Sequence, residues 1–365
     1  MKNKVIAVIN NKIVDYFIDV NIHLVLNTIA STFKLTLYKN EANKDIFKPF
    51  AFPTIQIYMK EVNSKNLLFT GFLTNIQMTK KKEITTSSIS GYSKPGILQH
   101  SHIPVALYPL EYENTTLRTI AEKVTRHFNL GLFIKGAANA ECDKKIEKIE
   151  FGKEEPIAQA ISRYTKEFGV TLSHDERGRL MFYKYVNIDP AESVILNDDK
   201  IIEISVLYNG NDMCTEMYGI SEAEQQKGRR GKKSLSDRLD YANAVSVQTP
   251  YIKKINKKYP LKISRTITQI ETDSKELQRL INSEIAKDAR NFTVTVKKYG
   301  WDFDGKFPRA GFYLTLESAD IGFEKTKMVI EEMKYTYDKN NNEVVEFSCV
   351  IVPVYSGILT KKTPY

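Results

Sequence analysis

The chain has little of what marks secreted, metal-binding or membrane-spanning proteins. Its 365 residues include three cysteines, Cys142, Cys214 and Cys349, and a single tryptophan. The cysteines form no CxxC pair and no histidine stands at metal-ligand spacing, so we expect no disulfide scaffold, no metal site and no cofactor. No run approaches the roughly 18 apolar residues of a membrane span, and Val5–Ile9 is too short for a signal peptide. We therefore expect synthesis and folding in the cytoplasm, without membrane insertion.

Signatures of catalysis are also missing. The sequence contains no Gly-Xaa-Ser-Xaa-Gly elbow, no phosphate-binding loop and no dinucleotide fingerprint. The adjacent carboxylates Asp198-Asp199, Glu154-Glu155 and Glu331-Glu332 would point to opposite faces of a strand or be hydrated in a loop, which does not suit acid/base chemistry. His127 and His174 are expected at the surface, His174 within a turn. We predict no catalytic residue and no enzymatic activity.

Aromatic residues and positive charge are abundant. Twenty tyrosines and eighteen phenylalanines, in a chain that is 42% hydrophobic, favour packed sheets. The formal net charge is +9. Its densest basic run lies in a stretch near 225–237 that has no apolar periodicity and reads as a mobile loop. The run is either a solvated loop or a contact to a channel or partner, and it contains Lys227, Arg229, Arg230, Lys232 and Lys233.

Periodicity divides the chain into three predicted domains. Residues 1–95 show about six runs with strand periodicity and no helix, which indicates a sandwich or barrel. Residues 96–190 change period, with apolar helical stripes starting at Leu117 and Ile157. The stripes superpose at an offset of 40 residues, through duplication or chance. Strands return over 191–365, which also contains a predicted helix near 275–290.

The segment Tyr299–Ala310, YGWDFDGKFPRA, separates two strands in the last domain. Gly300 and Trp301 open it, Gly305 accepts a positive φ in the Asp304-Gly305 turn, and Pro308 cannot donate to a sheet ladder. We therefore predict a structural role for this segment, which has no catalytic group at its centre.

Several segments, in a fixed order, resemble the baseplate hub family of contractile tails. The family includes the Mu-type phage tail protein, phage late control protein D and the hub portion of type VI secretion spike proteins. The matching segments are IASTFKLTL (29–37), FTGFLTNIQM (69–78), ISGYSKPGILQHS (89–101) with Gly91 and Ser93, the two middle helices, and Gly300-Trp301. Tyr92 stands where the family often has arginine, and Lys94-Pro95-Gly96 replaces an acidic residue.

The resemblance implies a mainly β fold with an α+β insert, in which two tube-like antiparallel β-barrel domains flank a small α+β middle domain. It further implies a homotrimeric ring with pseudo-sixfold symmetry that joins a hexameric tail tube to a trimeric central spike. Expected partners are the chain itself, the spike and the tube or tube-initiator protein, with the tape-measure protein and baseplate wedge as further candidates and DNA only in transit. The chain would be made in the host cytoplasm and end in the tail baseplate.

Two other classes stay open from the sequence. A nucleic-acid-binding protein would use the basic excess and show salt-sensitive binding. A tail-associated cell-wall glycosidase would need two carboxylates at a fixed separation in a cleft.

Overall fold

The computed structural model describes residues 5–38, 48, 50–82, 84–184, 190–197, 201–211, 214–222, 239–248, 263–270, 274–337 and 343–352. The chain forms two compact units. The first contains Met1–Ser205, Thr295–Ala319 and Glu324–Cys349, and the second contains Val206–Val294, Asp320–Phe323 and Val350–Tyr365. Strands are the commonest elements among the described residues, so the predicted mainly β fold with an α+β insert is confirmed. The boundaries at residues 95 and 190 remain predictions.

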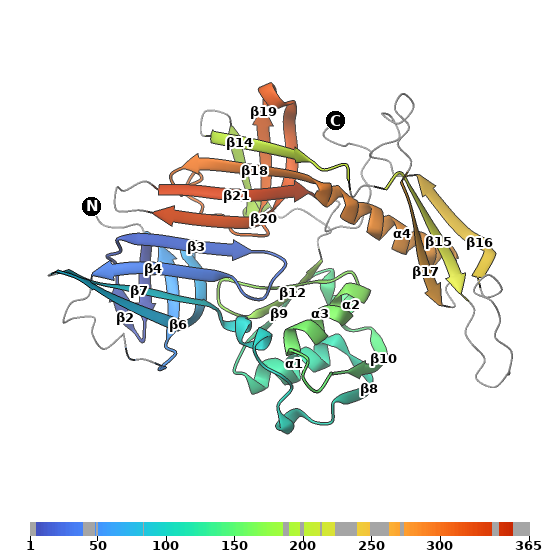
Figure 1. Cartoon of the computed structure of the whole chain (residues 1–365), viewed down its shortest axis with the longest axis horizontal. Helices are drawn as coiled ribbons and strands as arrows, with labels where there is room; N and C mark the ends of the chain where they lie inside the picture. Colours follow the sequence, from blue (N-terminus) through green and yellow to red (C-terminus); the bar gives the residue numbers. More distant parts are fainter. Residues whose placement is uncertain are drawn as a thin grey trace. The chain divides into compact units, whose positions relative to one another are not determined.

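The first unit is built on a sheet that joins N-terminal and C-terminal strands (Figure 1). Its N-terminal strands are β1 (Val5–Ile9), β2 (Lys12–Val14), β3 (Asp19–Val25), β4 (Thr32–Tyr38), β5 (Thr54–Met59), β6 (Leu67–Lys81) and β7 (Ile84–Ser93). Its later strands are β13 (Ser193–Asn197), β14 (Ile201–Tyr208), β18 (Phe292–Tyr299), β19 (Tyr313–Ser318), β20 (Phe323–Tyr337) and β21 (Glu343–Ile351).

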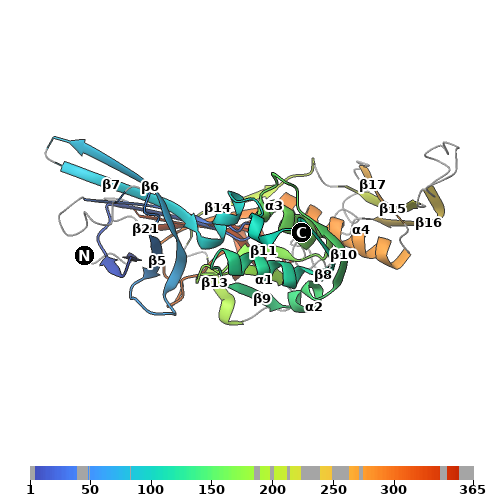
Figure 2. The ribbon, with the colours of Figure 1, turned by 90° about the horizontal axis from the view of Figure 1, so that it is seen from below.

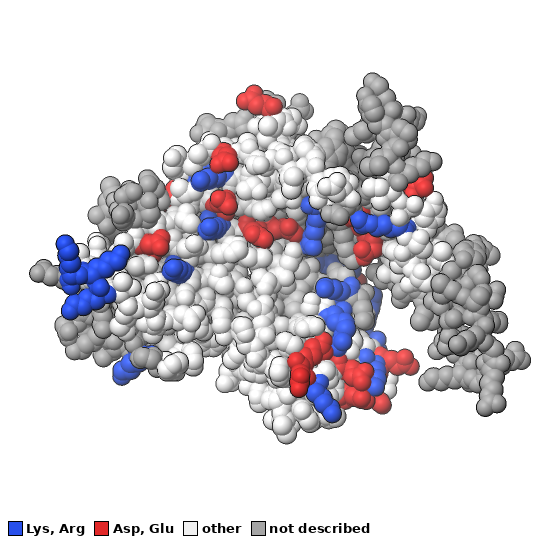
Figure 3. Space-filling view, in the orientation of Figure 1, with Lys and Arg blue, Asp and Glu red and all other residues white. Residues whose placement is uncertain are grey.

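The order in this sheet is β14-β18-β21-β20-β3-β4-β7-β6-β5-β1-β2, with β19 pairing β20 and β13. Antiparallel pairing of β20 with β3, from Glu332↔Val25 to Tyr337↔Val20, joins the two ends of the sequence. Alternating burial along β1 and β3 puts every second side chain into the core, as strand geometry requires. The paired ends of β6 and β7 project as a ribbon (Figure 2), and basic side chains gather at its tip (Figure 3).

The insert has a core of its own within the first unit. Its helices are η2 (Lys94–Gln99), η3 (Val105–Leu107), α1 (Leu117–His127), α2 (Ala138–Cys142) and α3 (Ile157–Glu167). Its strands are β8 (Glu111–Thr116), β9 (Leu132–Gly136), β10 (Lys145–Glu150), β11 (Thr171–His174) and β12 (Leu180–Lys184). The Thr116 hydroxyl caps α1 by accepting from the Thr119 N–H at 3.1 Å. Because both predicted stripes are buried, α1 and α3 face a shared interior.

The second unit is a small α+β assembly. Strand β15 (Glu216–Glu222) pairs antiparallel with β16 (Leu239–Gln248) and parallel with β17 (Ser264–Ile270). Helix α4 (Ser274–Asp288) lies where the sequence predicts a helix near 275–290, and it buries Leu277, Ile281 and Ile285. A Cβ added at Gly219 would stand 2.9 Å from Ile281, so this glycine lets the helix pack closely on β15. Among the described residues, the remaining short helices are η4 (Pro190–Glu192), η7 (Ala289–Asn291) and η8 (Ala319–Ile321).

Candidate functional site

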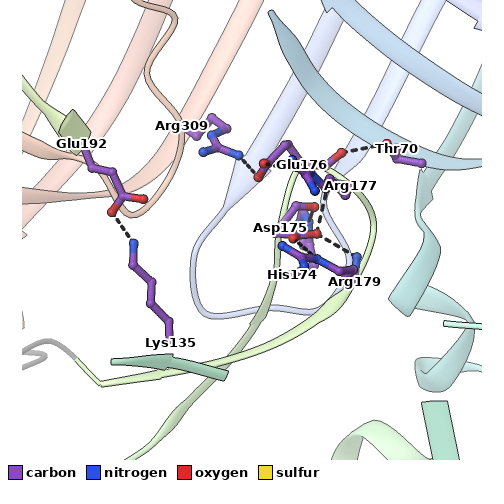
Figure 4. Close-up of polar contacts among 9 residues, drawn as sticks. All are labelled: Thr70, Lys135, His174, Asp175, Glu176, Arg177, Arg179, Glu192 and Arg309. Atoms are coloured by element: carbon purple, nitrogen blue, oxygen red, sulfur yellow. Dashed lines mark hydrogen bonds and ion pairs between the residues drawn. The ribbon is translucent and has the colours of Figure 1, made fainter. Parts of the chain in front are cut away.

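The turn between β11 and β12 is the best-defined polar cluster of the first unit (Figure 4). Asp175 shapes it, since its Oδ1 accepts from the N–H groups of Arg177 at 3.1 Å and Arg179 at 2.8 Å. Its Oδ2 accepts from Arg179 Nε at 2.5 Å. Gly178 supplies the positive φ of +73° that closes the turn, a conformation other residues rarely adopt. Local sequence alone therefore fixes the shape of this tip.

The tip holds the insert against the sheet. Thr70 of β6 donates its hydroxyl to the main-chain oxygen of Glu176 at 2.7 Å. The Glu176 carboxylate forms an ion pair with Arg309, which lies near the end of the Tyr299–Ala310 segment. Burial alone would raise the pKa of Glu176, but the Arg309 charge and the surrounding N–H donors outweigh it and lower that pKa. Glu176 is therefore ionised at neutral pH, as the ion pair requires.

His174 lies at the centre of the junction and is partly buried at the end of β11, which corrects the prediction of a surface histidine within a turn. Its Nε2 lies 2.7 Å from the Ser31 hydroxyl, and its Nδ1 lies 3.1 Å from the main-chain oxygen of Asp175. Burial lowers the pKa of the imidazole, so the ring is neutral at pH 7. Because a carbonyl oxygen only accepts, Nδ1 carries the proton and Nε2 accepts from Ser31.

Ser31 connects His174 to a residue of the predicted structural motif. The Ser31 hydroxyl also accepts from the Val25 N–H at 2.9 Å, while the Ser31 N–H donates to Ser93 Oγ at 3.1 Å. Ser93 in turn donates its hydroxyl to the main-chain oxygen of Ile29 at 2.8 Å. The predicted motif residue Ser93 thus provides hydrogen-bond partners for main-chain groups of the buried turn between β3 and β4. The β11–β12 turn joins the same network through the contact of His174 with Ser31.

This serine–histidine pair is unsuited to nucleophilic catalysis. Ser31 is 1% exposed, and its hydroxyl already accepts one hydrogen bond and donates another. The second imidazole nitrogen faces a main-chain carbonyl, whereas a catalytic triad places a carboxylate there to stabilise the imidazolium. The geometry supports a neutral, structural role for both residues.

A cavity of about 280 Å³ adjoins the junction, with Leu24, Phe133 and Met181 among its apolar lining residues. Its carboxylates are paired in the wall: Glu192 with Lys135, Asp175 with Arg179, and Glu176 with Arg309. Such paired charges hold the walls together and leave little unbalanced charge to attract a ligand. The cluster is therefore best understood as an electrostatic clamp.

The predicted motif around the single tryptophan lies at another junction of the first unit. Trp301 is 1% exposed, and its Nε1 donates to the main-chain oxygens of Thr336 and Val344, each at 3.1 Å. Gly300, at φ +72°, donates its N–H to Glu343 O at 2.8 Å. These contacts fasten the segment to the β20–β21 pair.

The rest of the segment contacts the N-terminal strands as well as β20. Gly305, at φ +84°, donates its N–H to Asp302 Oδ1 at 2.5 Å and so closes the predicted turn. Asp302 also pairs with Lys60, which follows β5. The main-chain oxygen of Pro308 accepts from the Tyr335 hydroxyl at 2.6 Å. The segment therefore links the C-terminal strands to the N-terminal ones, and it also contains Arg309 of the clamp.

Sequence reasoning missed Lys298, whose ammonium group organises this turn. Only 5% exposed, it donates to the main-chain oxygens of Tyr299 at 3.0 Å, Gly300 at 3.1 Å and Asp302 at 2.9 Å. The alternation of β18 was an available signal, because Lys298 shares the face of buried Phe292, Val294 and Val296.

Gly91 of the predicted motif permits a close strand crossing. A Cβ at this position would lie 1.9 Å from the main-chain oxygen of Phe72 in β6. The basic residues Lys227, Arg229, Arg230, Lys232 and Lys233 lie outside the described residues, so their predicted role as a channel or partner contact stays a prediction.

In the described part of the chain, no helix has the length and hydropathy of a membrane span. Within the same ranges, no three histidine, cysteine, aspartate or glutamate side chains gather as metal ligands would.

Comparisons with known proteins find solved structures with a similar fold. No protein-family model matches the chain, and no curated protein matches its sequence. The 43 kDa tail protein of prophage MuSo2 from Shewanella oneidensis superposes with a TM-score of 0.73 at 16% identity, covering 95% of this chain and 98% of that one. A tail protein from Neisseria meningitidis MC58 gives 0.74 at 12% identity, covering 98% and 99%.

A component of the type VI secretion system from E. coli gives a TM-score of 0.57 at 10% identity, covering 94% of this chain and 76% of that one. The chain therefore has the fold of phage tail proteins and of a type VI secretion component. The resemblance seen in the sequence is confirmed at the level of the fold.

Proposed function

We propose that the chain is a structural baseplate hub protein of a contractile tail. Three copies form a ring with pseudo-sixfold symmetry that joins the hexameric tail tube to the trimeric central spike. The observation that carries the proposal is a shared fold over 95% or more of this chain and of two phage tail proteins. Such coverage leaves little of the chain for a separate catalytic domain, which supports a role without enzymatic activity.

The open edges of the sheet support assembly into a ring. Strands β2 and β14 end the strand order within the described residues. Apolar side chains stand exposed on both, with Ile13 at 64% and Leu207 at 59%. Edge strands of this kind are sites where another chain can pair. A ring contact that buries these edges would also bury some of the exposed aromatic side chains.

The clamp supports a load-bearing role. The hairpin tip ties the insert to β6 through Thr70 and to the loop before β19 through Arg309. The hydrogen bond and the ion pair fix the geometry of this contact, and removing one partner would leave the other partly buried and unsatisfied. A ring subunit that must stay rigid until discharge would use such fastening.

Light scattering on the purified chain, alone and mixed with its spike protein, tests the proposal. We expect a species of three copies of the 41.9 kDa chain, with the spike added when present. A chain that remains monomeric with the spike in excess would refute the trimeric hub.

A further inference from the structure

We propose that neighbouring subunits of the ring meet head to tail, with the tip of the β6–β7 ribbon of one copy on the β8–β10 face of the next. The inference rests on the proposed trimeric function and names the surfaces that meet. The ribbon tip is Lys80–Lys82 with Ile84–Thr85, and the β8–β10 face is the outward side of that strand pair around Glu111, Glu113, Lys148 and Glu150.

The ribbon tip extends past the rest of its sheet. Strand β5 accompanies β6 only as far as the pair Thr54↔Phe72, and β4 accompanies β7 only as far as Tyr38↔Thr86. Beyond these points β6 and β7 stay paired to Lys81↔Ile84 (Figure 2). Across Lys80–Lys81 and Ile84–Thr85, none of the described strands adds a third. A two-stranded ribbon is only marginally stable alone in water, so this one gains from a partner.

The tip is basic. Lys80, Lys81 and Lys82 follow one another and are all exposed, and no described carboxylate forms an ion pair with them. Ile84, directly across from Lys81, is 57% exposed. Three adjacent ammonium groups repel one another and would be stabilised by facing carboxylates. The tip therefore suits an acidic protein surface with a small apolar contact.

The β8–β10 face supplies such a surface. Tyr112 and Ile149 pair across the strands and turn inward, while Glu113↔Lys148 and Glu111↔Glu150 form the outward pairs. Three exposed carboxylates share one ammonium group, which leaves a net charge of two negative units. Lys148 Nζ lies 3.1 Å from Glu111 and 3.6 Å from Glu150.

The pairing of Glu111 with Glu150 is a stronger reason than the net charge to expect a basic partner at this face. Like charges directly across an antiparallel pair are destabilising, and Glu111 faces Glu150 in this register. Lys148 offsets the repulsion in part, and Glu113 adds a further negative charge beside it. Lysines from outside would relieve this repulsion.

The two surfaces lie at opposite ends of the first unit, with the ribbon at one end and β8–β10 at the other (Figures 1 and 3). The ribbon tip of one copy therefore cannot contact the β8–β10 face of the same copy. Identical copies placed head to tail can make this contact, and a heterologous contact of this kind closes a ring when the rotation between copies permits. Because both surfaces are exposed, the contact sets register and association rate and should weaken as salt screens the charges.

Charge reversal tests the pairing. One variant carries Lys80→Glu, Lys81→Glu and Lys82→Glu, a second carries Glu111→Lys, Glu113→Lys and Glu150→Lys, and a third combines all six. A control with the same charge change on exposed lysines elsewhere carries Lys65→Glu, Lys327→Glu and Lys334→Glu. Trimer affinity is measured by sedimentation with the spike present, at about 50 mM and about 300 mM salt.

We expect each three-residue variant to weaken the trimer by about tenfold at low salt, and less at high salt. The combined variant should recover most of the loss, and the control should match wild type. A combined variant no better than its parents, or parents that assemble like wild type, would overturn the inference and leave the trimeric hub standing. Loss of tube binding with an intact trimer would assign the ribbon to the tube and also overturn it. A wild-type chain that never trimerises would refute the proposed function itself.

Discussion

Acidification should weaken the junction through His174, and a single substitution should abolish the effect. Burial lowers the pKa of His174 in the folded state, while the nearby Asp175 and Glu176 raise it and Arg309 lowers it. In the unfolded chain the pKa of a histidine is about 6.5. Below that pH the unfolded state binds more protons than the folded state. The free energy of unfolding therefore decreases as the pH is lowered, until the pH reaches the pKa of His174 in the folded state.

The magnitude follows from the same linkage. Each pH unit between the two pKa values costs about 1.4 kcal/mol of folding free energy. At about pH 5.5, one unit below the unfolded value, His174 should therefore remove up to about 1.4 kcal/mol. Glu176 does not confuse the measurement, because its pKa is lowered and it stays ionised there.

Urea denaturation followed by the fluorescence of Trp301 measures the effect, since this is the chain's only tryptophan and is 1% exposed. The comparison uses wild type, His174→Gln and His102→Gln, from about pH 7.5 to about pH 5.5. A glutamine at 174 can accept from Ser31 and donate to Asp175 without titrating. The exposed His102 is the control.

Wild type and His102→Gln should lose stability together as pH falls, and His174→Gln should stay level through the same range. If His174→Gln lost as much stability as wild type, the neutral buried imidazole would be the wrong description of this junction.

Three further substitutions test the packing. Trp301→Phe keeps a ring but leaves two main-chain oxygens without their N–H donor, so it should cost about 1–3 kcal/mol in urea denaturation followed by circular dichroism. Gly91→Ala should prevent folding or separate β6 from β7, because its methyl group would lie 1.9 Å from the main-chain oxygen of Phe72. The control Gly210→Ala has open space around it and should leave the free energy of unfolding nearly unchanged. Arg309→Gln should raise the pKa of Glu176 and increase hydrogen exchange in the β11–β12 turn, and unchanged exchange would argue against the clamp.

Local periodicity predicted the helices because the decisive information lies within a few turns. Burial of Leu117, Ile120 and Val124 at helical spacing places α1 where the apolar stripe indicates. Pro156 lies at the N-cap of α3, and Phe168 is its C-cap. Such positions depend on neighbours in sequence, so the sequence alone determines them well.

Long-range pairing left no comparable signal. The sequence could predict strands near Asp19–Val25 and Phe323–Tyr337, yet nothing in either indicates that they pair with each other. The same limit applies to His174, whose turn sequence suggests exposure. Its ring contacts Ser31 and packs edge-on against Phe69, and both residues are distant in sequence but close in the fold. A junction made by several segments is visible only once those segments are placed.

The most direct test of the hub is electron microscopy of the purified full-length chain mixed with its spike protein. The account predicts closed, three-lobed rings with pseudo-sixfold outline, each with one spike on its axis. Fields of single, unringed particles under conditions where the spike itself is trimeric would contradict it.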